Sequence, residues 1–144
     1  MKPFQLDYNY PEEESLTSMV NEPVAVSYLI EPKFSFARFT ALQPFFGFTQ
    51  LEWAGILHLS DRTLQRYQRD NTAFTGLQAE QLLHLERLGK LGNELFSHVH
   101  AFQQWLRTPK QVLNQLLDFK ALSSTTGIQM LIAELGRIAH GVYI

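Results

Sequence analysis

Apolar residues recur at helical spacing along most of the chain that follows residue 32. From Phe34 to about His98 they return every three or four positions, without the alternation that predicts a strand. A second block with the same spacing follows a break near His98 and ends at Gly141. The pattern predicts an all-α protein with a first helical domain over 33–98 and a C-terminal domain over 99–144.

Residues 1–32 lack this spacing. They contain four prolines and an acidic run from Glu12 to Glu14. Such a composition buries little apolar surface, so we expect an acidic N-terminal arm that is partly disordered. The whole chain has a net charge of -2. Because the arm is acidic, the rest of the chain is mildly basic, which by itself is weak support for a nucleic-acid partner.

Residues 50–69 have the pattern of a helix-turn-helix. We expect a helix over 50–57, a turn over 58–60 and a second helix over 61–69, with Ser60 as its N-cap. Ala54 is the small residue that lets two crossing helices approach each other. The predicted inward-facing side chains are apolar or aromatic: Trp53, Leu57, Leu59, Leu64 and Tyr67.

His58 is the departure from this pattern, because the turn usually has glycine at its position. A left-handed backbone costs little for glycine and more for histidine. We therefore expect a turn that differs in detail from the usual one, and the effect of His58 on DNA binding is open.

The outward face of the second helix carries basic and amide side chains. Arg62, Gln65, Arg66 and Arg69 recur at steps of three and four, which places them on one side. Arginine can bond guanine edges or phosphates, and glutamine can bond adenine. Further phosphate contacts are expected at the start of this helix, from Thr63 and from the backbone at Ser60. The face predicts a recognition helix in the DNA major groove, with a solvated face or a dimer contact as the alternatives.

In the C-terminal block, Thr108 and Pro109 have the order of an N-cap and a first helical turn. The run 111–117 is expected to add apolar core positions: Val112, Leu113, Leu116 and Leu117. A last helix follows the loop 123–126, with an apolar side made of Ile128, Leu131, Ile132, Leu135 and Ile138. We expect Glu134 and Arg137 to pair across one turn of it and Gly141 to end it.

Several motifs of this block resemble a known family. Trp105-Leu106-x-x-Pro109-x-x-x-Leu113, then Gly127, then 135–142 with the sequence LGRIAHGV, resemble the toxin-binding domain of Xre/MbcA/ParS antitoxins. The segment Leu57-x-Leu59-Ser60-x-Arg62-Thr63-Leu64 is similar to the helix-turn-helix of the same antitoxins. The resemblance covers about residues 34–144. The chain departs from it between Leu113 and Gly127, where the family usually has a glycine-rich turn and a proline.

The resemblance implies a function. Such antitoxins bind a toxin with a RES domain, which consumes NAD, and cover its active-site cleft with their C-terminal region. They commonly form homodimers and repress their own operon by binding operator DNA. The residues that it implies in toxin contact are Arg137, His140, Gly141, Val142, Tyr143 and Ile144. The last three form an apolar tail, and tyrosine and arginine are frequent interface anchors; the alternative is a tail that folds back onto its own core.

Two other functions stay open on the sequence. One is a stand-alone helix-turn-helix transcription regulator whose C-terminal domain only dimerises, and the weaker one is a structural helical adaptor that uses the acidic arm. The first of these predicts salt-sensitive operator binding without a toxin partner.

The sequence offers no catalytic constellation, so we expect a protein that is not an enzyme and needs no cofactor. It has no HExxH, no phosphate-binding glycine loop and no G-x-S-x-G. His98 and His100 are spaced to point apart on a helix, so no metal site is expected. The absence of cysteine, of a long apolar run and of a signal-like start leads us to expect a cytoplasmic protein without a membrane span.

Overall fold

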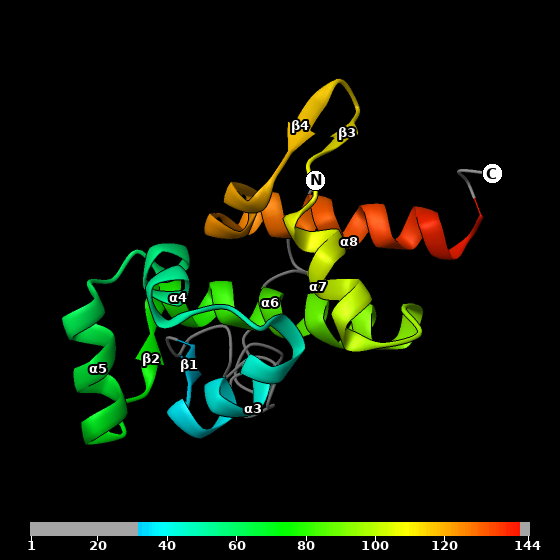
Figure 1. Ribbon diagram of the computed structural model, residues 1–144. Helices are drawn as coiled ribbons and strands as arrows, with labels where there is room; N and C mark the ends of the chain where they lie inside the picture. The colour runs from blue at the N-terminus through cyan, green and yellow to red at the C-terminus, as the bar shows by residue number, and fades with distance from the viewer. Residues whose placement is uncertain (1–31, 142–144) are drawn as a thin grey trace, which may run out of the picture. The chain divides into compact units, whose positions relative to one another are not determined.

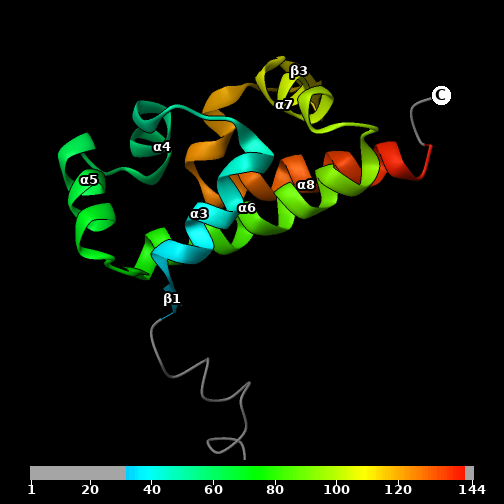
Figure 2. The same cartoon turned by 60° about the horizontal axis from the view of Figure 1, so that its bottom comes forward.

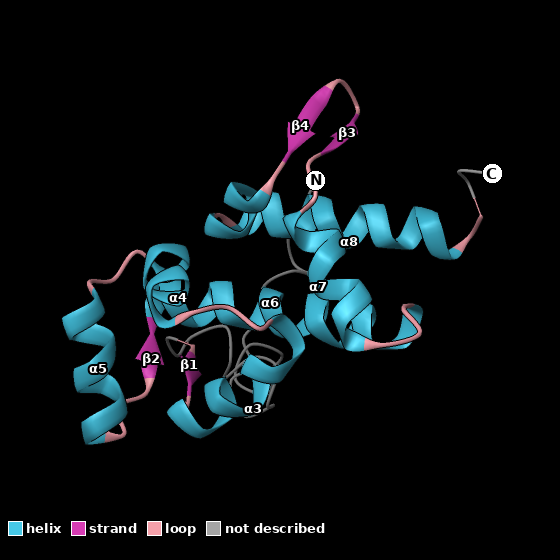
Figure 3. Ribbon diagram, in the orientation of Figure 1, coloured by secondary structure: helices cyan, strands magenta, loops and turns pink. Residues whose placement is uncertain are grey.

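The computed structural model describes residues 32–141. The chain divides into two units, Met1–Pro32 and Lys33–Ile144, and the architecture below is that of the second. Its described residues are mostly helical (Figures 1 and 3), which confirms the predicted helical character. The α-helices are α3 (Phe36–Phe46), α4 (Gln50–Leu57), α5 (Asp61–Asp70), α6 (Gly76–Leu95), α7 (Val99–Arg107) and α8 (Thr125–Ala139). A short 3-10 helix, η1 (Phe119–Ser123), precedes α8.

Two small antiparallel sheets accompany the helices, and the sequence pattern did not predict them. In the first, β1 (Lys33–Phe34) pairs with β2 (Phe74–Thr75). In the second, β3 (Lys110–Val112) and β4 (Gln115–Leu117) form a hairpin. These strands are two or three residues long, too short to show an alternating pattern in the sequence.

One apolar core runs through this unit. Helices α6 and α8 lie side by side (Figures 1 and 2), and α3, α4 and α7 pack around them. The largest fully buried side chains are aromatic: Trp53, Phe34, Phe39, Phe46, Phe74 and Phe102. Edge-to-face contacts join several of these rings, with 4.9 Å between the centroids of Phe39 and Trp53. The core includes buried residues on both sides of position 98, and the division into 33–98 and 99–144 stays a prediction.

The predicted helix that begins at Pro109 is wrong. Thr108 is the C-cap of α7 rather than an N-cap, and the β3–β4 hairpin occupies 110–117. Leu113 and Asn114 at its tip both have positive φ, as a two-residue type I′ turn requires. The core assignment there is half right, because Val112 and Leu117 are buried whereas Leu113 and Leu116 are 77% and 59% exposed.

The last helix begins where the sequence pattern placed its cap. The Ser124 hydroxyl accepts a hydrogen bond from the Gly127 N–H at 3.0 Å. A Cβ on Gly127 would stand 2.1 Å from the Ala121 carbonyl oxygen, so the close approach of η1 to α8 requires glycine. Three predicted apolar positions of α8 are buried, but Ile138 is 41% exposed.

Candidate functional site

Helices α4 and α5 are held at a tight turn by caps at both sides of it. His58 ends α4 in the left-handed region, with φ 59° and ψ 39°, the region that glycine adopts at little cost. The Leu59 N–H donates to the Ala54 carbonyl at 2.9 Å, which closes the turn. Ser60 then caps α5, because its hydroxyl oxygen accepts from the Thr63 N–H at 3.0 Å. The predicted bounds of both helices agree with those observed to within one residue.

The inner side of this pair is anchored in the core as predicted. Trp53, Leu57 and Leu64 are at most 2% exposed, and Ala54 is buried as well. Leu59 and Tyr67 pack against the core from its margin. The Tyr67 ring lies 5.3 Å from the Phe74 ring of β2. Since the inner face of α5 is fixed in this way, its opposite face is presented to solvent.

The outer face of α5, which we call the α5 face, consists of Arg62, Gln65, Arg66 and Arg69. All four side chains are exposed, and together they line an open surface hollow of ≈ 480 Å³. The structure thus brings together the four side chains that the helical spacing had placed on one side.

Two acidic residues lie beside the α5 face and take up part of its hydrogen-bonding capacity. Gln65 Nε2 donates to a carboxylate oxygen of Asp61 at 2.9 Å. Arg69 Nε pairs with Asp70 at 3.0 Å, and this hydrogen bond lowers the pKa of Asp70 and raises the pKa of Arg69. No ion pair within residues 32–141 involves Arg62 or Arg66. The Arg66 guanidinium lies 5.9 Å from the Tyr67 ring centroid and helps to lower the pKa of Asp70, so of the two, Arg62 has more freedom to meet an anionic partner.

The hydroxyls of Ser60 and Thr63 lie at the N-terminal end of α5. Ser60 Oγ donates to Thr63 Oγ1 at 2.8 Å while it caps the helix. Phosphate contact was predicted for Thr63 and for the backbone at Ser60, and both lie at this helix N-terminus, a place that favours anions.

Three of the predicted toxin-binding residues, Arg137, His140 and Gly141, lie at the C-terminal end of the described residues. Arg137 pairs with Glu134 at 3.0 Å across one helical turn, which is the predicted contact. His140 is the exposed C-cap of α8, and Gly141 follows it with φ 70°. The Gly141 N–H donates to the Ile138 carbonyl at 3.0 Å, so this glycine ends the helix as expected. Val142, Tyr143 and Ile144 lie outside the described residues.

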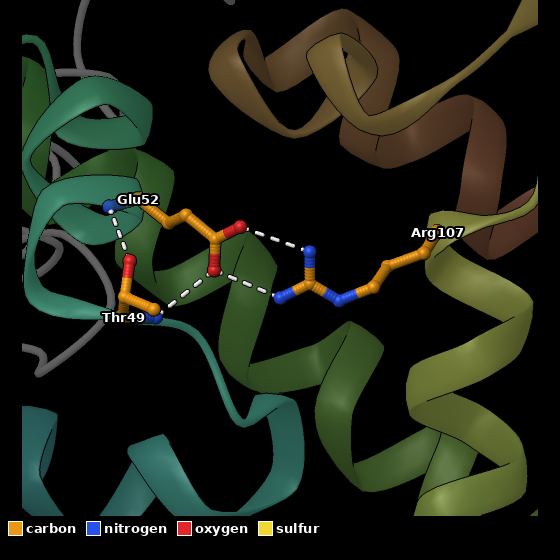
Figure 4. A network of polar contacts seen from close by, with 3 residues as sticks. All are labelled: Thr49, Glu52 and Arg107. Carbon is orange, nitrogen blue, oxygen red and sulfur yellow. Dashed lines mark hydrogen bonds and ion pairs between the residues drawn. The ribbon is translucent and has the colours of Figure 1, made fainter.

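A salt bridge that the sequence did not reveal joins α4 to α7 (Figure 4). Arg107 donates from both terminal nitrogens to the two Glu52 carboxylate oxygens, at 2.8 and 2.9 Å. Glu52 also completes a capping box with Thr49, because its carboxylate accepts a hydrogen bond from the Thr49 N–H at 2.9 Å. The Arg107 hydrogen bonds are the main cause that lowers the pKa of Glu52 to about 2. The Thr49-x-x-Glu52 spacing is a readable capping signal, but nothing in the sequence connects position 52 with position 107.

The histidines at 98 and 100 lie differently from the prediction. His98 is the N-cap of α7 rather than a helical residue, and its Nδ1 accepts from the Ala101 N–H at 3.2 Å. Its ring therefore stacks on that of His100, with 6.4 Å between centroids, instead of pointing away. Across residues 32–141, no group of three or more His, Cys, Asp or Glu side chains is arranged to hold a metal ion.

The described helices also bear on membrane association. None of them is both long and apolar enough to cross a bilayer.

In comparisons with known proteins, no protein-family model and no curated protein matches the chain.

Proposed function

We propose that this protein binds DNA through the α5 face and acts as the DNA-binding antitoxin of a toxin–antitoxin pair. The observation that carries the DNA-binding part is the α5 face itself. Three arginines and a glutamine are exposed on one side of a helix whose other side is anchored in the core. A helix of this kind enters the major groove with its N-terminal residues toward the base edges.

The side chains of the α5 face differ in what they can offer DNA. Arg62 and Gln65 lie in the first turns of the helix, where a recognition helix reaches base edges. Arg69 lies in the last turn and is paired with Asp70, so it would have to exchange that partner for a phosphate. Arg62 and Arg66 therefore contribute most to the proposed affinity. Gln65 contributes specificity by exchanging its Asp61 partner for a base edge.

The first experiment measures binding to the DNA directly upstream of the protein's own gene. In a gel-shift titration, Arg62→Ala with Arg66→Ala weakens binding at least about tenfold, because two charge-assisted contacts are lost. The matched control is Arg87→Ala with Lys90→Ala, which removes two positive charges from exposed positions of α6. Equal binding by the α5 variant and the wild type would exclude the α5 face as the DNA-binding surface.

The C-terminal end of α8 supports a second part of the proposal, contact with a protein partner. Ile138 is half-exposed and His140 is exposed beside it. A Cβ on Gly136 would meet nothing within 4 Å, so the described fold gives this helical glycine no packing reason. From the resemblance, we propose that the partner is a RES-domain toxin that consumes NAD. Residues 137–144 would cover its active-site cleft.

Co-expression with the product of the adjacent gene tests the toxin part. The neighbour alone is expected to arrest growth and deplete cellular NAD, and this protein is expected to restore both. Deleting residues 141–144 is expected to abolish rescue while the helical circular-dichroism signal stays unchanged. A harmless neighbour that does not co-purify would favour the stand-alone regulator, and full rescue by the truncated chain would exclude the role of the tail.

Homodimer formation and repression of its own operon are further parts of the proposal that rest on the resemblance. A dimer would place two α5 faces on two operator half-sites, about one helical turn of DNA or a multiple of it apart. Footprinting is expected to show two protected half-sites with that spacing.

A further inference from the structure

His58 occupies a backbone conformation that favours a different residue. Its φ of 59° lies in the left-handed region, which glycine adopts at little cost and a bulky side chain at a higher cost. At the other end of α5, the left-handed position is filled by Asn71, a residue that tolerates it well. Glycine or asparagine would meet this backbone preference at least as well as histidine. The contacts of the side chain are therefore what distinguish histidine at position 58.

The His58 ring reaches a part of the chain that lies 65 positions away. Its Nε2 is 2.7 Å from the carbonyl oxygen of Ser123, the last residue of η1. Carbonyls at the end of a helical segment lack a partner within it, so Ser123 offers a free acceptor. The His58 side chain thus ties the α4–α5 turn to the segment that leads into α8.

A second side chain fixes the same junction from α6. Gln81 is 5% exposed, and its Nε2 donates to the Ile56 carbonyl at 2.6 Å and to the Leu122 carbonyl at 2.9 Å. Leu122 and Ser123 are consecutive, so neighbouring carbonyls of η1 are bonded to Gln81 and to His58. Gln81 therefore joins the end of α4 to η1, and His58 joins the α4–α5 turn to η1.

We propose that His58 is a positioning residue for the α5 face, which it orients by tying the turn to Ser123. Helix α5 packs mainly on α4, so the geometry of the turn sets the direction of its outer side chains. A recognition helix loses base contacts when it tilts in the groove, because hydrogen bonds weaken steeply with misalignment. The tie therefore adds to DNA affinity without a contact to DNA. This inference rests on the proposed DNA-binding function.

Three substitutions of His58 distinguish the effect of its hydrogen bond to Ser123 from the effect of the left-handed backbone. His58→Gly relieves the left-handed backbone and removes the tie, and His58→Asn tolerates the backbone but is too short to reach Ser123. His58→Gln keeps a donor at a similar reach. We expect DNA affinity to fall roughly three- to tenfold in the Gly and Asn variants, as for one lost hydrogen bond, and to recover in the Gln variant. Asn71→Gly, which changes the backbone preference at the other end of α5, is the matched control and is expected to bind as the wild type does.

A distance measurement tests the positioning without DNA. The chain has no cysteine, so Gln68→Cys on α5 and Gln129→Cys on α8 can carry spin labels at two exposed positions. With His58 unchanged, pulsed electron paramagnetic resonance is expected to give a narrow distribution of distances between the two labels. The distribution is expected to broaden in the His58→Gly and His58→Asn variants and to stay narrow in the His58→Gln and Asn71→Gly variants. The melting temperature of His58→Gly is expected to stay at or above that of the wild type.

The outcomes separate this inference from the proposed function. A distribution that stays narrow in His58→Gly overturns the inference, as does DNA binding at wild-type strength by both His58→Gly and His58→Asn. If the Arg62→Ala with Arg66→Ala variant binds DNA normally, the proposed function fails, and the spin-label distances alone then decide whether His58 positions α5.

Discussion

The Glu52 carboxylate combines two interactions at the scale of a single residue. It accepts from the Thr49 N–H at the start of α4 and pairs with both terminal nitrogens of Arg107. The Arg107 guanidinium also lies 4.9 Å from the Phe119 ring centroid, so it contacts η1 as well. The Glu52 carboxylate therefore caps α4 and, through Arg107, also connects α4 to α7 and η1.

Replacing Glu52 by Gln is expected to lower the free energy of unfolding at pH 7 by roughly 1–2 kcal/mol, after allowance for solvent screening of a partly exposed pair. The pKa of Glu52 is lowered from 4.5 to about 2 in the folded protein, so the carboxylate stabilises the fold above pH 4.5. This contribution is lost as the pH falls through about 2. Urea unfolding of the wild type and the variant at several pH values measures the difference.

Glu80→Gln is the control for this prediction, because Glu80 is exposed on α6 and has no hydrogen bond or ion pair of its side chain within residues 32–141. Its substitution is expected to change the unfolding free energy by less than about 0.5 kcal/mol. A Glu52→Gln variant as stable as Glu80→Gln at pH 7 would show that the salt bridge contributes nothing.

At the scale of elements, the sequence predicted those whose signals are local. The α4–turn–α5 bounds and the α8 cap follow from helical spacing, Ser60, Ser124 and Gly141, which act within a few residues. The β3–β4 hairpin was missed because its turn uses Leu113 and Asn114, neither of which is glycine. A short apolar run such as Val112 to Leu117 fits a helix as well as two strands, and tertiary packing decides between them.

Two glycines of α8 are expected to respond in opposite directions to the same substitution. Gly127→Ala brings a Cβ within 2.1 Å of the Ala121 carbonyl oxygen and is expected to cost more than about 2 kcal/mol, or to prevent folding. Gly136→Ala meets nothing within 4 Å and is expected to stabilise the helix by about 0.5–1 kcal/mol. Thermal unfolding followed by circular dichroism compares the two, and a destabilised Gly136→Ala would contradict the described packing of α8.

At the scale of the whole molecule, the contacts between residues far apart in the chain could not be predicted from the sequence. His58 with Ser123, Glu52 with Arg107 and Gln81 with Leu122 are separated by 65, 55 and 41 positions, and no spacing rule connects them. The members of the α5 face could be predicted because they share one helix. Their presentation to solvent depends on the core that holds α4 and α6, which only the structure describes.

The α5 face and the end of α8 give this protein two separate candidate surfaces. The first carries the arginines and the glutamine that suit DNA, and the second carries the exposed Ile138 and His140. We propose that DNA binds the α5 face and that a protein partner binds the end of α8. A nuclear magnetic resonance titration distinguishes the two surfaces residue by residue, since the chain is small enough at 16.6 kDa for assignment of its amides.

DNA binding by the α5 face is tested by adding the DNA upstream of the protein's own gene to ¹⁵N-labelled protein and following the amide chemical shifts. We expect the largest shifts at residues 60–69 and only small shifts of the α8 amides. Shifts that spare 60–69, or that are largest at the end of α8, would contradict the assignment of DNA binding to the α5 face.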